Sequence, residues 1–163
     1  MNDYEELLVA VRRITRAIDL HSKKLYKEVG LTTSQLLVLE AVKKLPQPTP
    51  SSIAREILLS QATVTSLVDR LERNGLLKRS KDGPDKRTVN ITITESGAGK
   101  ISDAPELLQS GFLKEFRELQ SWEQHMLLSS MQRVATMMDA EDIDAAPILT
   151  SGDIKISDCY QRR

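Results

Sequence analysis

The most informative part of the chain is residues 51–97, which read SSIAREILLSQATVTSLVDRLERNGLLKRSKDGPDKRTVNITITESG. Its first half holds two runs of apolar residues at the three- and four-residue spacing of amphipathic helices, and we expect the two helices to bury them: Ile53, Ala54, Ile57 and Leu58, then Val64, Leu67, Val68 and Leu71. Thr49 followed by Pro50 is typical of a helix start, and Ser60 is a favourable N-cap for the second run. Two short helices joined by a turn at Leu59 and Ser60 predict a helix-turn-helix.

The second half of this stretch predicts a β-hairpin. Residues 76–81 and 88–94 suit two strands, and the second alternates with Val89, Ile91 and Ile93 on one face. Turn-forming and charged residues fill positions 82–87 between the strands. We therefore expect a charged hairpin wing beside the helix-turn-helix.

Helical patterns flank this region on both sides. Residues 4–29 form an amphipathic pattern that Gly30 ends, and a helix capped by Thr32 or Thr33 follows, up to a connection containing Pro46, Pro48 and Pro50. After the hairpin we expect one long helix from Thr94 that bends at Pro105, then a helix from Ser121, with Gln124 at capping-box spacing, to about Met138. Residues 140–163 predict an acidic, mostly extended tail that docks Ile148, Leu149 or Ile154 on a neighbour.

The predicted fold is mainly α (α+β), a winged helix-turn-helix with N- and C-terminal helices that form a dimerisation domain. We expect an N-terminal dimerisation helix at 1–30, a winged helix-turn-helix at 31–95, C-terminal dimerisation helices at 96–139 and the acidic tail at 140–163. The terminal helices carry apolar stripes that a small winged helix alone could not cover, which favours their burial on a second copy of the chain. These stripes are Leu7, Val11 and Ile14, and Leu127, Leu128, Met131, Val134 and Met138.

Charge is unevenly distributed in a chain of 163 residues whose net charge is zero. Positions 70–87 hold seven basic and three acidic residues, a local charge of +4, whereas positions 139–158 hold six acidic residues and one lysine. Screening confines each field to roughly 8–10 Å, so a basic patch attracts phosphates whatever the total charge. There is no long apolar run, no signal-like N-terminus and one cysteine, so we expect a cytoplasmic protein without membrane spans or an intramolecular disulfide.

The second helix of the motif suits the DNA major groove. Short polar or methyl-bearing side chains at its N-terminal end let a helix lie deep and read base edges; here they are Gln61, Ala62, Thr63, Thr65 and Ser66. Phosphate contacts are expected from Arg70 and Arg73, and from Ser51 and Ser52 at a helix N-terminus. In the wing, Lys81, Lys86 and Arg87 suit an adjacent minor groove, and Asp85 is placed to orient Arg87 by a charge-assisted hydrogen bond.

Residues 5–138 resemble the MarR family of bacterial repressors, with its Asp-x-Arg wing element at Asp85 and Arg87 followed by a strand and Thr-Glu-x-Gly. The resemblance implies a homodimer that binds a pseudo-palindromic operator, with half-sites about 10 bp apart, and release by a small-molecule effector. The stretch RRITRAIDLHSKKL further resembles the subgroup that controls compatible-solute (ectoine-type) synthesis genes. That resemblance implies a role in osmotic stress.

A few residues and motifs bear on alternative functions. His21 lies on the apolar side of its helix, where a packed interface histidine is the more common outcome, and a ligand role is the alternative. His125 and Cys159 lack metal-site spacing, and no phosphate-cradling or nucleophile motif is present, so we expect no enzyme, no cofactor and no metal. The remaining alternative is a winged helix that binds only proteins.

Overall fold

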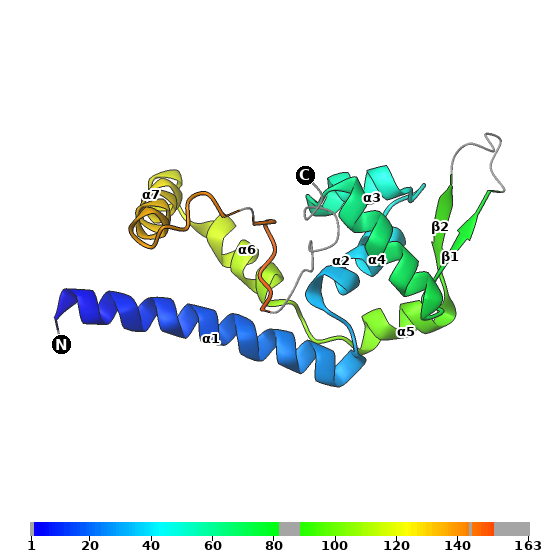
Figure 1. Ribbon diagram of the computed structural model, residues 1–163, viewed down its shortest axis with the longest axis horizontal. Helices are drawn as coiled ribbons and strands as arrows, with labels where there is room; N and C mark the ends of the chain where they lie inside the picture. The colour runs from blue at the N-terminus through cyan, green and yellow to red at the C-terminus, as the bar shows by residue number, and fades with distance from the viewer. Residues whose placement is uncertain (1, 82–88, 144, 152–163) are drawn as a thin grey trace. The chain divides into compact units, whose positions relative to one another are not determined.

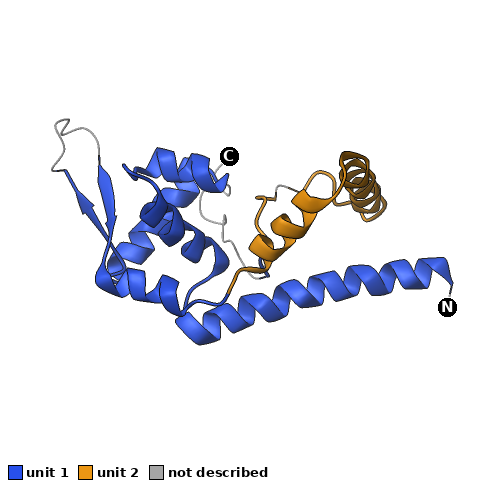
Figure 2. Ribbon diagram, turned by 180° about the vertical axis from the view of Figure 1, so that it is seen from behind, with its two compact units in different colours: residues 1–105, 149–163 blue, residues 106–148 orange. Residues whose placement is uncertain are grey.

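The computed structural model describes residues 2–81, 89–143 and 145–151. It divides into two compact units: Met1–Pro105 with Leu149–Arg163, and Glu106–Ile148 (Figure 2). Figure 1 shows the helices and the two strands along the chain. The mainly helical fold with a small two-stranded sheet is the predicted class.

The first unit begins with two helices whose ends follow from local signals. Helix α1, Asp3–Val29, ends at Gly30, which adopts the left-handed backbone (φ 71°) that glycine tolerates without strain. Helix α2, Thr33–Lys44, begins after Thr32, whose side chain accepts from the backbone of Gln35 while the Gln35 side chain accepts from Thr32. This reciprocal cap confirms the predicted start of α2.

The helix-turn-helix consists of α3, Pro50–Ile57, and α4, Gln61–Arg73. Thr49 caps α3 and Ser60 caps α4, as predicted. The prediction that Leu58 is buried was wrong, because this residue ends α3 in the left-handed conformation (φ 58°) and is 67% exposed. The helical pattern cannot continue through a residue that leaves the helix, so Leu58 points away from the core.

The wing's described part is an antiparallel pair, β1, Leu77–Ser80, and β2, Asn90–Ile93. Leu77 pairs with Ile93 and Ser80 with Asn90. Ile91 is fully buried, and its N–H donates to the Pro48 carbonyl at 2.9 Å. The free edge of β2 is thereby attached to the connection that precedes α3.

Helix α5, Glu95–Asp103, packs closely on the base of the wing. Thr94 caps α5 and also donates its hydroxyl to the Gly75 carbonyl at 2.7 Å. A Cβ at Gly97 would lie 2.2 Å from the Leu76 carbonyl oxygen, so only glycine permits this approach. The Thr-Glu-x-Gly sequence is therefore a packing element that joins α5 to the wing.

The core of the first unit is aliphatic and centres on α2, which contacts α3, α4, α5 and β2. Its most deeply buried side chains, each 2% exposed or less, include Leu25, Val38, Leu39, Ile53, Val64, Val68, Leu71, Leu77 and Ile91. Burying a side chain of this size contributes roughly 1.5–3 kcal/mol. This packing holds α3, α4 and the strands in one arrangement.

The second unit contains α6, Leu108–Glu118, and α7, Ser121–Met137. The prediction of a single bent helix from Thr94 was wrong: α5 ends at Asp103, and the next residue, Ala104, has the extended backbone (ψ 140°) that a following proline favours. The α7 cap is Gln120, paired with Glu123, so the predicted Ser121–Gln124 capping box was wrong by one position. Gln124 instead donates to the carbonyls of Phe116 and Leu119.

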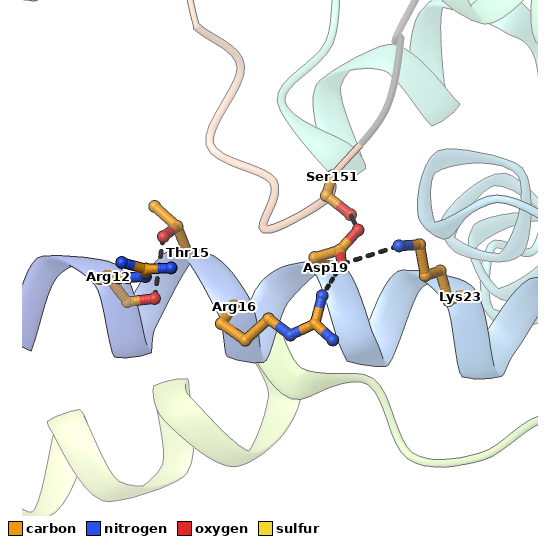
Figure 3. A network of polar contacts seen from close by, with 6 residues as sticks. All are labelled: Arg12, Thr15, Arg16, Asp19, Lys23 and Ser151. Carbon is orange, nitrogen blue, oxygen red and sulfur yellow. Dashed lines mark hydrogen bonds and ion pairs between the residues drawn. The ribbon is translucent and has the colours of Figure 1, made fainter.

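The described end of the chain returns to α1 in the first unit. Ser151 donates its N–H to the Ser22 hydroxyl at 2.9 Å. Its hydroxyl donates to Asp19 at 3.2 Å, as Figure 3 shows. Ile154, one of the predicted docking residues, lies outside the described residues. Among the described helices, none has the length and apolar character that crossing a membrane requires.

Candidate nucleic-acid interface

The N-terminal end of α4 presents the side chains predicted to read bases. Gln61, Ala62 and Ser66 are exposed, and Thr63 and Thr65 are half-buried. Val64, Val68 and Leu71 are fully buried on the opposite side of the helix. The core therefore orients α4 so that its small polar face meets solvent.

Two hydroxyls on this face already have partners. Thr63 shares a 2.7 Å hydrogen bond with the cap residue Ser60, and Thr65 donates to the Gln61 carbonyl at 2.8 Å. A hydroxyl that donates retains acceptor capacity, and each threonine keeps its methyl group for apolar contact. Gln61 and Ser66 are consequently the freer hydrogen-bonding groups of the predicted set.

The N-terminus of α3 is a second exposed polar end. The Ser52 hydroxyl accepts from the Thr49 N–H at 2.9 Å, which commits this side chain to the cap. Ser51 is exposed, and its hydroxyl lies 3.2 Å from that of Thr49. Free amides at a helix N-terminus attract anions, so this end is suited to a phosphate.

Cationic groups continue the surface toward the wing. Arg70 and Arg73 are exposed on α4, and the Arg73 guanidinium donates to the backbone carbonyl of Asp69 at 3.4 Å. Lys81 is exposed at the last described position before the wing loop. Asp85, Lys86 and Arg87 lie outside the described residues, so the predicted Asp-x-Arg contact stays a prediction.

Sequence reasoning missed Arg79, which joins β1 to α4. Its guanidinium forms ion pairs with Asp69 and with Glu72, the latter at 2.7 Å. The backbone N–H of Arg79 also donates to the Glu72 carboxylate at 3.0 Å. Burial lowers the pKa of Arg79, but the hydrogen bonds to Asp69 and Glu72 outweigh it and raise the pKa above its ordinary value. No local sequence signal marks this cluster, because its members come from a helix and a strand.

His21 is exposed on α1. A cavity of about 630 Å³ lies nearby, and His21 is not among its described lining residues, which are Asp19, Ser22, Lys23, Tyr26, Lys27, Thr32, Thr33, Ser34, Thr150 and Ser151. The ligand role of His21 stays a prediction. Within the described part of the chain, no three His, Cys, Asp or Glu side chains gather as a metal site requires.

Comparison with known proteins matches residues 31–89 to the MarR family. The HTH-type transcriptional regulator PecS of Dickeya dadantii is 30% identical over 109 residues, which are 64% of this chain and 66% of PecS. The HTH-type transcriptional regulator MhqR of Bacillus subtilis is 32% identical over 98 residues, which are 60% of this chain and 68% of MhqR. The match thus spans about two thirds of each relative.

The fold also resembles that of solved structures. The MepR–DNA complex of S. aureus has a TM-score of 0.54 and 18% identity, covering 85% of this chain and 96% of MepR. At this identity the likeness concerns the fold.

Proposed function

Because the chain belongs to the MarR family, we propose that it is a transcription regulator that binds double-stranded DNA in a sequence-specific manner. The observation that carries the proposal is the N-terminal face of α4, where Gln61, Ala62 and Ser66 are exposed; Arg70, four positions after Ser66, is exposed further along the same helix. Such side chains are small enough for a helix in the major groove and carry base-reading groups. The relatives PecS and MhqR are named transcriptional regulators, so the function we propose is binding rather than enzymatic.

We further propose that the active form is a homodimer. Helix α1 exposes Leu7, Leu8 and Ile14, and α7 separately exposes Leu127, Leu128 and Met131, each between 42% and 59%. Exposed apolar rows on helices are normally buried on a partner. A two-fold dimer presents two α4 helices, which suits a pseudo-palindromic operator with half-sites about 10 bp apart.

The regulatory mode we propose is repression by occlusion of a promoter in the cytoplasm, relieved when a signal or small ligand changes the spacing of the two α4 helices. When one α4 helix of the dimer is bound, the other is held near its own half-site at a high effective concentration, which raises the affinity. A change in the spacing of the two helices therefore weakens binding strongly. Control of compatible-solute genes stays a prediction based on residues 12–25. DNA from upstream of such genes is the probe that tests it.

The test is fluorescence anisotropy with duplex from upstream of the protein's own gene and with random duplex, at two salt concentrations. We expect salt-sensitive binding to the upstream duplex, and we expect Arg70→Ala to weaken it and to reduce the salt slope by about 1. Lys24→Ala removes the same charge from α1 and serves as the control, with affinity expected to stay near that of the wild type. Absence of binding to any duplex at low salt would contradict the proposal and favour a winged helix that binds proteins.

A further inference from the structure

Arg79 is held by two carboxylates of α4 rather than directed to solvent. Its side chain is 26% exposed, whereas that of Asp69 is 46% exposed and that of Glu72 is 37% exposed. Glu72 binds both the guanidinium and the backbone N–H of Arg79. Because the arginine is less exposed than both partners, it is poorly placed to contact a phosphate itself.

Asp69 lies on the same row of α4 as the proposed base-reading residues. It follows Thr65 by four positions and Ser66 by three, and residues at these spacings share one helix face. DNA that approaches this face brings its phosphates close to the Asp69 carboxylate. An uncompensated carboxylate there repels the duplex, and low solvent access at the interface strengthens that repulsion.

The same ion pairs attach the wing to α4. Arg79 belongs to β1, and its partners lie on the second half of α4. The opposite strand, β2, is attached through the bond from the Ile91 N–H to the Pro48 carbonyl. Arg79 therefore fixes the β1 edge of the wing, as Pro48 fixes the β2 edge.

We propose that Arg79 is a positioning residue for DNA binding, which masks the Asp69 and Glu72 carboxylates and fixes the wing against α4 without contacting DNA. This inference rests on the proposed function, since it assigns a role within the same surface. It makes the effect of Arg79 depend on the two carboxylates. A direct phosphate contact has no such dependence.

The test is a mutant cycle measured by anisotropy with the upstream duplex. Arg79→Met is compared in the wild type and in an Asp69→Asn, Glu72→Gln background. We expect it to weaken binding about tenfold or more in the wild type and less than about threefold in the background without carboxylates, because coupled residues are not additive. Lys78→Met removes the same charge from the neighbouring, exposed position of β1 and is expected to change affinity less than about threefold.

Circular dichroism is recorded for every variant, and binding is measured at a temperature at which all are folded. If Arg79→Met does not fold, Arg79→Lys replaces it, since lysine keeps the charge but loses the planar fork that binds two carboxylates; its loss of affinity should also disappear in the background without carboxylates.

Equal loss of affinity in both backgrounds, or no loss in either, overturns the role of Arg79 while leaving the proposed function standing. Failure of the wild type to bind any duplex at low salt overturns both.

Discussion

At the scale of single residues, two side chains have settings that the sequence pattern does not indicate. Leu58 adopts a left-handed backbone with its side chain exposed, which costs an L-residue roughly 1–2 kcal/mol. Asp19 joins α1 to Ser151, a residue more than a hundred positions away. The setting of Leu58 depends on where α3 ends, and that of Asp19 depends on where the chain returns to α1. Neither can be predicted from the spacing of apolar residues.

Leu58→Gly is expected to stabilise the protein by about 0.5–1 kcal/mol, because glycine relieves the strain and the gain exceeds its entropic cost. Thermal unfolding followed by circular dichroism measures the change. Leu58→Ala is the control, since alanine removes the exposed side chain but keeps the strain. An equal gain from alanine would show that the backbone conformation is not the cause.

The contact between Asp19 and Ser151 should depend on pH. The hydrogen bond from Lys23 is the main cause that lowers the Asp19 pKa, and Ser151 and Arg16 act in the same direction against the desolvation that raises it (Figure 3). A lowered folded-state pKa means that the contact is fully present above the pKa of a free aspartate and is lost as pH falls through the lowered value.

The amide resonances of Ser22 and Ser151 in an NMR pH titration report this contact. They should shift together at acidic pH and should lose that transition in Asp19→Ala. A transition that persists in this variant would assign the effect to another group.

At the scale of elements, local signals predicted most of the helix starts and failed where tertiary contacts decide. The ends at Gly30, Thr32, Thr49 and Ser60 were predicted because each cap lies within a few residues of the helix it serves. A bend at Pro105 was predicted where the helix in fact stops, because a proline in the sequence does not by itself distinguish a kinked helix from two separate helices. The pairing of Arg79 with Asp69 and Glu72 was not predicted, because it requires the packing of β1 on α4.

The packing of α5 on the wing gives a matched pair of glycine substitutions. Gly97→Ala should destabilise the protein by about 1–3 kcal/mol, because the added Cβ would meet the Leu76 carbonyl at 2.2 Å. Gly99→Ala faces open space in the same helix and should stabilise by about 0.5–1 kcal/mol. Chemical denaturation of both variants measures the opposite signs, and two changes of the same sign would refute this account of the Thr-Glu-x-Gly sequence.

At the scale of the whole molecule, the exposed apolar rows of α1 and α7 support the proposed dimer, and the polar face of α4 supports the proposed DNA binding. The residues expected to contact DNA were identified from the chemistry of their side chains, and these contacts remain predictions. The predicted domain boundaries likewise await a test, although the compact units divide at Pro105, away from the predicted boundary after residue 95.

Light scattering after size exclusion tests the proposed dimer. We expect twice the chain mass of 18.3 kDa for the wild type and a single chain mass for a Leu128→Glu, Met131→Glu variant, because buried unpaired charges are strongly unfavourable. Leu58→Glu changes a leucine at the end of α3 that is more exposed than Leu128 (67% against 53%), and this variant should remain dimeric. A wild type of single chain mass at micromolar concentration would contradict the dimer.

Base reading by the N-terminal face of α4 is measured as the ratio of the dissociation constants for random and upstream duplex. Gln61→Ala, Ser66→Ala should lower this preference at least about tenfold while leaving the affinity for random duplex nearly unchanged. Arg70→Ala, which removes a proposed phosphate contact, should weaken binding to both duplexes alike and keep the ratio. A ratio unchanged by the loss of Gln61 and Ser66 would contradict the claim and assign sequence recognition to another surface.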